Sequence, residues 1–486
     1  PVKHRWIVLL CSSIVFYAIA GIRYLPFIFV TSFTVYLAGR KMGRIYDEQE
    51  EAAKADGLSR KEKKELKDQA KARCRSTMIW VLVLNLAILI LCKYLKFFVE
   101  PINALWQRAG GSGEFTAASI IVPLGISYYT FSALGYLLDI YWRRISWEKS
   151  YPRFLLYLIY FPHILQGPIE RYGRLGQRLK EELRFDYQRV TFGIQLIVWG
   201  FMKKLILADR LDVFISGVYK NYERAEGLIF VVAALLDVVY IYADFSGCMD
   251  MARGISQIFG VELDLNFDHP FSSKDIAEFW RRWHITLGEW FKDYVYYPVS
   301  TSKLVKKISK KTRNNWPPRL SRLAMNALPV TVTWILTGLW HGTGKTYLAW
   351  GVYYAVLLLI SSTFGEDLHQ LAVKCKIRTE TMSWSLFQMA RTTLIFAGGR
   401  PLTRPGGLRK TLHIGKSILT DFNPWVLTDG TLYSFGLEQD AMLLSAVFIA
   451  VFGVVGWYQK KASIRETIAA QNLVFRWSIY LAGVLA

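Results

Sequence analysis

Long apolar runs recur from one end of the chain to the other, and they constrain its fold more than any other feature. They lie at residues 6–20, 24–37, 78–98, 190–207, 228–242, 323–339, 442–457 and 474–486, with shorter runs at 154–165 and 348–361. Several approach the ~20 residues that a helix needs to cross a bilayer. The runs are continuous, whereas barrel strands alternate. The pattern predicts an all-α, polytopic membrane protein of about ten or more transmembrane helices, as one membrane domain over residues 1–486.

The formal net charge is +22. On a soluble protein this excess would suggest nucleic acid. On a membrane protein it fits basic loops kept in the cytoplasm, so we expect no nucleic-acid partner. Residues 303–322 hold eight Lys and Arg and no acid, and residues 40–75 hold twelve basic and eight acidic residues. We predict that the basic loops 40–75 and 301–322 are cytoplasmic and contact anionic membrane lipids, with 47–73 forming a solvated helix.

The cysteines and the N-terminal residues bear on three other features: disulfides, metal sites and a signal peptide. None of the five cysteines forms a C-x-x-C pair, so we expect no disulfide framework and no metal site. Lys3, His4 and Arg5 precede the first apolar run, and no small-residue cleavage site follows it. The first run is therefore interpreted as a span and not as a signal peptide.

Residues 280–294 place His284 among tryptophans, next to Arg281 and Arg282. As a single helix, this segment has an apolar stripe at steps of three and four residues, made of Trp280, Trp283, Leu287, Trp290, Phe291 and Tyr294. His284 would lie on the edge of the stripe. Such a helix suits a cavity wall or a membrane interface. The alternative to a functional histidine is one that only satisfies a backbone carbonyl.

A second histidine, His341, ends the apolar run 323–339 after Trp340. Ionisable residues at membrane depth are costly and usually face a cavity or a functional partner. Gly338 and Gly342 leave room for a ligand or a neighbouring helix. Histidine also suits proton transfer near neutral pH. The alternative is a helix-end histidine at the lipid headgroups.

Three further segments carry polar groups into apolar surroundings. Ser127 lies in 123–131, Gln166 in 161–172 and Asp244 in 240–247. Pro and Gly in the second segment predict a broken or re-entrant helix. A buried Asp244 needs a partner, for which Arg253 or a hydroxyl is the expectation. For most of these residues taken singly, packing and helix breaks are the simpler explanation.

With these segments the sequence resembles the membrane-bound O-acyltransferase (MBOAT) family, and within it the bacterial alginate O-acetyltransferase-like branch. The resemblance rests on segments 123–131, 161–172, 240–247, 266–298 and 338–342, in that order. It implies a helical protein around a central funnel or tunnel, with His341 and His284 as catalytic histidines. It further implies a multi-pass protein of the bacterial plasma membrane that acts on a cell-surface polysaccharide.

For substrates and partners, the resemblance implies a cytoplasmic thioester donor, acetyl-CoA or another acyl thioester, with no permanently bound cofactor. It also implies an extracytoplasmic partner of the SGNH-hydrolase type. Trp340, Trp283 and Tyr242 become candidate tunnel walls, and Asp244, Gln166 and Ser127 candidate substrate contacts. The stretches 268–271 and 396–401 depart from the usual pattern, and the chain starts where such proteins have usually completed one span.

Two other functions fit parts of the pattern. One is D-alanyl transfer to teichoic acid from an acyl carrier protein, which would need a cytoplasmic surface shaped for a small acidic protein. The other is a lipid or polysaccharide transporter without covalent chemistry. A transporter predicts inverted repeats and paired broken helices, and the sequence contains no internal repeat.

Overall fold

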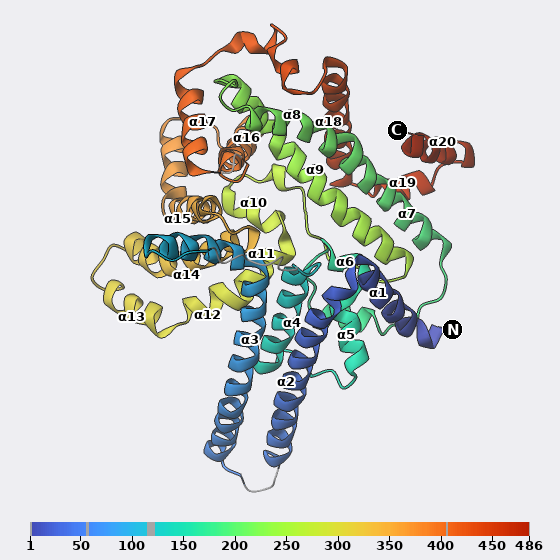
Figure 1. Ribbon diagram of the computed structural model, residues 1–486, viewed down its shortest axis with the longest axis vertical. Helices are drawn as coiled ribbons and strands as arrows, with labels where there is room; N and C mark the ends of the chain where they lie inside the picture. The colour runs from blue at the N-terminus through green and yellow to red at the C-terminus, as the bar shows by residue number, and fades with distance from the viewer. Residues whose placement is uncertain (1, 55–57, 114–121, 405–406, 486) are drawn as a thin grey trace. The chain divides into compact units, whose positions relative to one another are not determined.

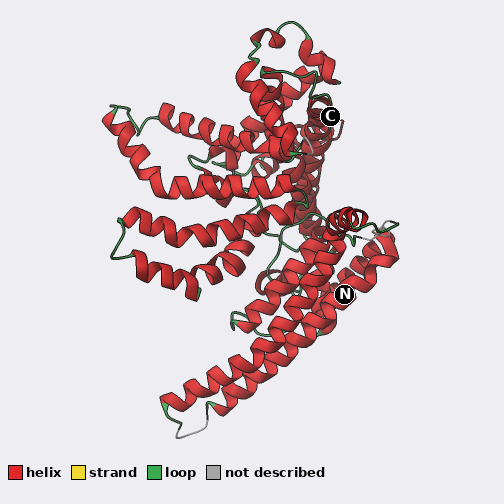
Figure 2. Cartoon of the chain, turned by 60° about the vertical axis from the view of Figure 1, so that its left-hand side comes forward, coloured by secondary structure: helices red, strands yellow, loops and turns green. Residues whose placement is uncertain are grey.

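The computed structural model describes residues 2–54, 58–113, 122–404 and 407–485. Over these residues the chain is helical, and its β-structure is one isolated antiparallel bridge between Phe267 and Trp283 (Figure 2). The all-α class and the polytopic membrane fold are therefore confirmed. The described chain divides into two compact units, residues 1–187 with 259–264 and residues 188–258 with 265–486. This division does not test the prediction of one membrane domain.

Seven helical stretches of the described chain are long and apolar enough to cross a membrane. The ten apolar runs in the sequence reduce to this number for three reasons. Runs 6–20 and 24–37 fall in one continuous helical stretch, Arg5–Ala52. The run 154–165 is broken near Tyr160, and the run 474–486 gives only the shorter helix Leu473–Val484. The run 348–361, by contrast, lies inside a full-length span, Lys345–Lys374.

The first unit contains α1 (Arg5–Gly21), α2 (Leu25–Ala52), α3 (Arg60–Arg108), α4 (Ile126–Tyr141), α5 (Tyr151–Ile159), α6 (Phe161–Ile164) and the π-turn η3 (Tyr172–Gly176). Helices α2 and α3 lie side by side (Figure 1). The single solvated helix predicted over 47–73 is wrong, because α2 ends at Ala52 and α3 begins at Arg60. Ser59 starts α3 by accepting a hydrogen bond from the Glu62 backbone N–H, while Glu62 accepts one from Ser59 in return. The broken helix predicted over 161–172 is confirmed, since α6 has only four residues.

The second unit begins with α7 (Tyr187–Phe201), the π-segment η4 (Met202–Ala208), α8 (Asp209–Lys220) and α9 (Leu228–Ile258). Short helices follow: α10 (Ile276–Arg282), α11 (Ile285–Phe291), the π-turn η6 (Lys292–Tyr296), α12 (Tyr297–Ser300) and α13 (Lys303–Thr312). The unit ends with α14 (Pro318–His341), α15 (Lys345–Lys374), α16 (Met382–Gly399), α17 (Leu408–Thr420), α18 (Gln439–Gln459), α19 (Ile464–Ala469) and α20 (Leu473–Leu485). Three 3₁₀ helices also lie in this part of the unit, η7 (Arg400–Leu402), η8 (Pro424–Leu427) and η9 (Thr431–Phe435).

Paired glycines bring α7 and α9 into close backbone contact. A Cβ on Gly200 would lie 2.6 Å from the carbonyl oxygen of Gly247, and one on Gly193 would lie 2.7 Å from that of Gly254. Because the two glycines on each helix are seven residues apart, they fall on one face, and each meets its partner on the antiparallel helix. Small residues at such positions let helix backbones approach closely in membranes. The contact with α7 thus helps to fix the position of α9, the helix that carries Asp244 and Phe245.

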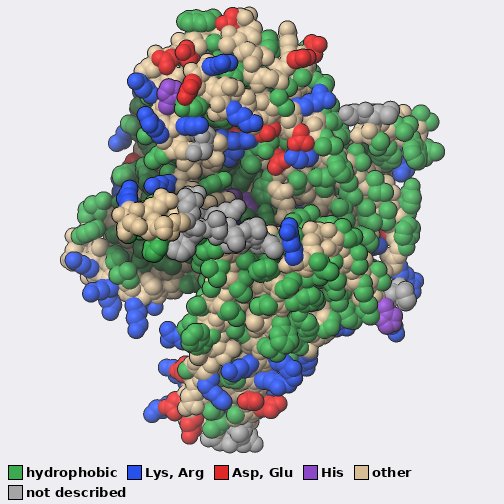
Figure 3. All heavy atoms as spheres, viewed as in Figure 1, with side chains coloured by type: hydrophobic (Ala, Val, Ile, Leu, Met, Phe, Trp, Pro, Cys, Tyr) green, Lys and Arg blue, Asp and Glu red, His purple; other side chains and the backbone are tan. Residues whose placement is uncertain are grey.

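The surface separates basic from apolar regions. Lys and Arg side chains gather along α13, and apolar side chains cover much of the middle of the face shown (Figure 3). Helix α13 has basic residues Lys310 and Lys311 in its last turn, where positive charge complements the helix dipole. The predicted basic loop 301–322 is therefore largely this amphipathic helix and the start of α14.

Candidate active site

His284 lies in a break between two short helices, and the single helix predicted over 280–294 is wrong. Helix α10 ends at Arg282, and α11 begins only at Ile285. His284 has φ 49° and ψ 52°, the left-handed conformation that a non-glycine residue rarely adopts. Such strain persists when the surrounding contacts over-determine it, and it occurs often at functional sites.

A distant segment causes this break. The backbone N–H of Asp268 donates to the Arg282 carbonyl, and that of Ile285 donates to the Asn266 carbonyl, both at 3.0 Å. The Asn266 side chain caps α11 in addition, since its Oδ1 accepts the Thr286 backbone N–H at 3.1 Å. A capping residue usually precedes its own helix, whereas here the cap comes from twenty residues earlier. The helical periodicity of residues 280–294 therefore gives no indication of this cap.

The His284 ring is held on one side only. Its Nδ1 lies 3.1 Å from Asn266 Oδ1, whereas its Nε2 is buried and has no hydrogen-bond partner within the described chain. The side chain is 4% exposed, and Phe245 of α9 packs edge-on against it at 4.7 Å between centroids. Burial, and secondarily the nearby His341, holds the pKa of His284 well below its usual value. The imidazole is therefore neutral at physiological pH.

His341 lies beside His284. It is the last residue of α14, and its ring centroid is 6.5 Å from that of His284. Trp340 contacts both imidazoles, at 5.7 Å from His284 and 4.8 Å from His341, and Trp350 of α15 lies 5.2 Å from His341. His341 is exposed, whereas His284 is buried. Of the two imidazoles, only that of His341 is therefore accessible from outside the protein.

The tryptophan and tyrosine wall candidates fall into one aromatic cluster. Trp283 stacks on Phe279 with a 17° interplanar angle and lies 6.1 Å from Tyr242. Phe267 joins this cluster to the histidines, because it contacts Trp283 at 5.0 Å and Phe245 at 5.1 Å. Trp340, Trp283 and Tyr242 therefore belong to a continuous aromatic surround, although a tunnel wall remains a prediction for all three.

The partner expected for Asp244 is wrong. Asp244 Oδ1 accepts a hydrogen bond from Lys204 Nζ at 2.7 Å, and Lys204 also binds Asp209 at 2.6 Å. Arg253 instead lies 3.7 Å from Asp250. Lys204 lies in the π-segment η4, which packs against α9. With this ion pair, Asp244 has a structural explanation.

Ser127 and Gln166 belong to the first unit, and their relation to the histidines stays a prediction. Ser127, near the start of α4, accepts a hydrogen bond from Lys93 Nζ at 3.5 Å. Lys93 lies on α3, in its apolar run 78–98. Gln166 is half-buried in the loop after α6.

A buried ion-pair cluster in the second unit was also missed. Asp237 is fully buried on α9 and accepts hydrogen bonds from Arg400 Nε at 2.7 Å and Arg404 Nε at 3.0 Å. Arg404 extends the cluster to Asp212 of α8 at 2.8 Å. The sequence does contain a signal for this cluster. Asp237 is a charged residue inside the apolar run 228–242, and Arg400 lies inside the unusual stretch 396–401.

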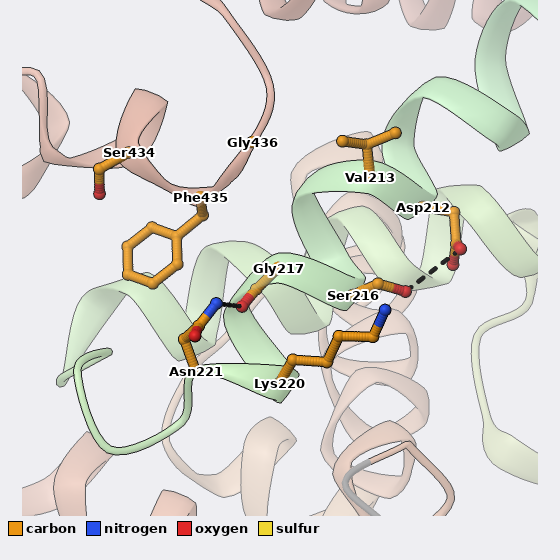
Figure 4. A pocket seen from close by; sticks show the side chains of 9 residues that line it. All are labelled: Asp212, Val213, Ser216, Gly217, Lys220, Asn221, Ser434, Phe435 and Gly436. Atoms are coloured by element: carbon orange, nitrogen blue, oxygen red, sulfur yellow. Dashed lines mark hydrogen bonds between the residues drawn. The ribbon is translucent and has the colours of Figure 1, made fainter.

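An open pocket of about 500 Å³ lies elsewhere in the second unit (Figure 4). The pocket is lined by Asp212, Ser216 and Lys220 of α8 and by Asn221, which follows α8. The segment 434–436 lies opposite them. The pocket lining includes neither histidine. Among the described residues, no group of three His, Cys, Asp or Glu side chains is placed to hold a metal ion.

Comparisons with known proteins show which proteins the chain resembles. A family model for MBOAT, the membrane-bound O-acyltransferase family, matches residues 143–312. The probable alginate O-acetylase AlgI of Pseudomonas syringae is 26% identical over 466 residues, which cover 94% of this chain and 78% of that protein. The peptidoglycan O-acetyltransferase of Helicobacter pylori is 26% identical over 390 residues, 74% of this chain and 64% of that protein.

The teichoic acid D-alanyltransferase of Bacillus subtilis is 29% identical over 254 residues, which cover 51% of this chain and 61% of that protein. The family match includes the α10–α11 segment with His284, and the alignment with the alginate O-acetylase spans nearly the whole chain. The chain is thus similar to the membrane-bound O-acyltransferase family, whose model matches residues 143–312, and to an alginate O-acetylase over 94% of its length.

Proposed function

We propose that the chain transfers an acetyl group from a cytoplasmic thioester, acetyl-CoA, toward hydroxyls of an extracytoplasmic cell-surface polysaccharide. An extracytoplasmic SGNH-type protein is the expected partner in the final transfer. The observation that carries the proposal is the histidine pair, with its imidazoles 6.5 Å apart and one of them exposed. Paired histidines in an aromatic surround suit proton transfer away from bulk water.

His341 is the proposed general base. It takes the proton of the acceptor hydroxyl while the oxygen attacks the thioester carbonyl carbon. The tetrahedral intermediate collapses, the carbon–sulfur bond breaks, and the departing thiolate receives the proton from His341. The products are an ester and a free thiol, so atoms and charges balance. General-base catalysis of this kind typically contributes about 10²–10⁴-fold.

His284 supports this base from behind. Its burial and lowered pKa keep it neutral, so it adds no positive charge next to His341. A neutral imidazole accepts a hydrogen bond and thereby stabilises the charge that His341 acquires with the hydroxyl proton.

The comparisons favour acetyl over D-alanyl transfer. Alignment with the alginate O-acetylase extends over 94% of this chain, against 51% for the teichoic acid D-alanyltransferase. An acyl carrier protein in place of coenzyme A remains the alternative donor. A transporter without covalent chemistry would not require a buried, strained histidine next to an exposed one.

The test uses the purified full chain in lipid nanodiscs, supplied with acetyl-CoA and an oligosaccharide acceptor, with and without an SGNH-type partner. We expect thiol release coupled to ester formation in the wild-type protein and neither in His341→Ala. The control is His369→Ala, which removes an exposed histidine of α15. Equal ester formation by His341→Ala and wild type would refute the catalytic role. Turnover only with a D-alanyl carrier protein would establish the alternative donor.

A further inference from the structure

The hydrogen bonds around Asn266 determine which nitrogen of His284 carries its proton. The backbone N–H of Thr286 has a hydrogen to give and no lone pair to offer, so the Asn266 atom that it meets at 3.1 Å must be the amide oxygen. The Thr286 hydroxyl lies 3.0 Å from the same oxygen. The amide nitrogen of Asn266 turns the other way and donates to Met249 Sδ at 3.3 Å. The orientation of this amide is thus fixed by a backbone donor and does not depend on the histidine.

The histidine tautomer follows from this orientation. Because Asn266 Oδ1 only accepts, the His284 Nδ1 that lies 3.1 Å from it must donate and must carry the hydrogen. In a neutral imidazole the other nitrogen then holds a lone pair. Nε2 of His284 is that atom, and it is buried without a hydrogen-bond partner in the described chain.

Asn266 is built to hold this arrangement. Its side chain is 1% exposed, and its backbone carbonyl accepts the Ile285 N–H, the residue after the histidine. The same residue therefore fixes the His284 backbone through Ile285, the start of α11 through Thr286 and the imidazole through Nδ1. Capping α11 would need only the contact between Asn266 and the Thr286 N–H. The additional contact with the buried imidazole of His284 indicates a second role for Asn266.

The ring centroids of the two histidines lie farther apart than those of a directly hydrogen-bonded pair. A direct N–H···N hydrogen bond would bring two imidazole centroids to about 5 Å, and the observed distance is 6.5 Å. A bridging oxygen of a hydroxyl or a water would then connect the two rings. A protonated His341 can then donate through that oxygen to the Nε2 lone pair of His284, with no net proton transfer to His284.

We propose that Asn266 is a positioning residue that keeps the His284 proton on Nδ1, so that Nε2 is always the hydrogen-bond acceptor that supports His341. The inference rests on the proposed acyl transfer for its purpose. The tautomer itself stands on the hydrogen bonds alone. With the opposite tautomer, His284 would present an N–H toward a protonated base and would destabilise it.

The first experiment measures the tautomer without any reaction. The full chain is labelled with ¹⁵N-histidine in nanodiscs, and the His284 signals are assigned by their loss in His284→Gln. We expect the Nδ1-protonated neutral form in the wild type and in Asn266→Asp, because a carboxylate also accepts from Nδ1–H. Asn266→Leu should lose that preference. A wild-type His284 protonated on Nε2 would overturn the proposal, whether or not the protein transfers acetyl groups.

The second experiment measures turnover in the same variants. Asn266→Leu should lower kcat by about as much as His284→Gln, roughly 10–100-fold, as is typical when a residue that orients a catalytic group is lost. Asn266→Asp should keep most of the activity, with the acid limb of its pH profile moved to higher pH, since the new charge raises the pKa of His284. A merely structural role predicts neither the rescue by Asp nor the moved limb. Equal losses in Leu and Asp variants that remain folded would overturn the proposal.

The matched control is His269→Asn. His269 lies three residues from Asn266, has φ 46° and pairs with Asp268 at 2.9 Å, outside the histidine pair. Asparagine tolerates this backbone conformation, so we expect wild-type activity and an unchanged His284 signal. If acetyl transfer fails in the wild type while the Nδ1 tautomer is observed, the proposed function is wrong and the positioning role of Asn266 stands.

Discussion

The ring centroids of His284 and His341 lie 6.5 Å apart, although 57 residues separate them in the sequence. His341 ends a long apolar helix, whereas His284 occupies a strained break between two short ones. Trp340 touches both rings. The exposed imidazole therefore has a buried, neutral imidazole as its neighbour, and this difference in environment separates their proposed roles.

The pair should behave as one unit in a double-mutant cycle. His341→Ala should lower kcat by about 10²–10⁴-fold, and His284→Gln by less, since His284 acts through His341. The double variant should be no slower than His341→Ala alone, because residues that act together are not additive. The measurement is kcat at saturating donor for the four proteins. Losses that multiply would show that the two histidines act independently.

Close backbone packing between α7 and α9 should make Gly200 intolerant of a side chain. Valine at this position would place Cβ 2.6 Å from the Gly247 carbonyl oxygen, which no rotamer relieves. We expect Gly200→Val to lower the midpoint of thermal unfolding strongly or to prevent accumulation in membranes. Gly453→Ala on α18 is the control, since nothing lies within 4 Å of its added Cβ. Similar unfolding midpoints for both variants would contradict the packing argument.

Periodicity predicted the apolar spans well, because a bilayer imposes the same demand on every crossing helix. It failed at Trp283 and His284, where no Gly or Pro marks the break and where pairing with residues 266–268 overrides the helical pattern. The partner expected for Asp244 was also wrong, because the observed partner, Lys204, lies forty residues earlier in the sequence. Both histidines were proposed from the sequence by their chemistry, and the structure places their rings side by side. Asn266 was not found, since a hydrogen bond across twenty residues leaves no local signal.

The buried carboxylate of Asp237 should depend on its arginines. Arg400→Met removes the 2.7 Å partner from a fully buried charge. Breaking a buried ion pair typically costs about 3–5 kcal/mol of unfolding free energy, and we expect a value at or below this range, because Arg404 still contacts Asp237. Adding Asp237→Asn to Arg400→Met should recover part of the loss. A double variant less stable than Arg400→Met would contradict this account. The measurement is denaturant unfolding in detergent.

The basic helix α13 should lie in the cytoplasm, because its lysines oppose translocation. The test introduces Ser309→Cys after the exposed cysteines Cys11 and Cys375 are replaced by serine. An impermeant maleimide should label inverted vesicles and leave intact cells unlabelled. Labelling of intact cells from outside would contradict the orientation. Permeabilised cells provide the control that the cysteine is reactive.

Glu170 should make the first unit less stable as pH rises. Its carboxyl is fully buried, Oε1 accepts the Asp264 backbone N–H at 2.7 Å, and Oε2 has no hydrogen-bond partner within the described chain. Burial, and then the Asp264 charge, raises the pKa of Glu170 from 4.5 to about 8. The folded state therefore binds this proton more tightly than the unfolded state does. The resulting stability is fully present below about pH 4.5 and is lost as the pH rises through about 8.

Replacing Glu170 with glutamine should remove this dependence. Glutamine keeps an oxygen for the Asp264 N–H and has no ionisable group. We expect the thermal midpoint of the wild type to fall between pH 5 and about 8.5, and that of Glu170→Gln to fall less. Glu182→Gln changes an exposed carboxylate in the same unit, and it should follow the wild type. If Glu170→Gln also follows the wild type at every pH, then Glu170 is ionised in the folded protein and its charge must be compensated by the neighbouring Arg174 and Arg178.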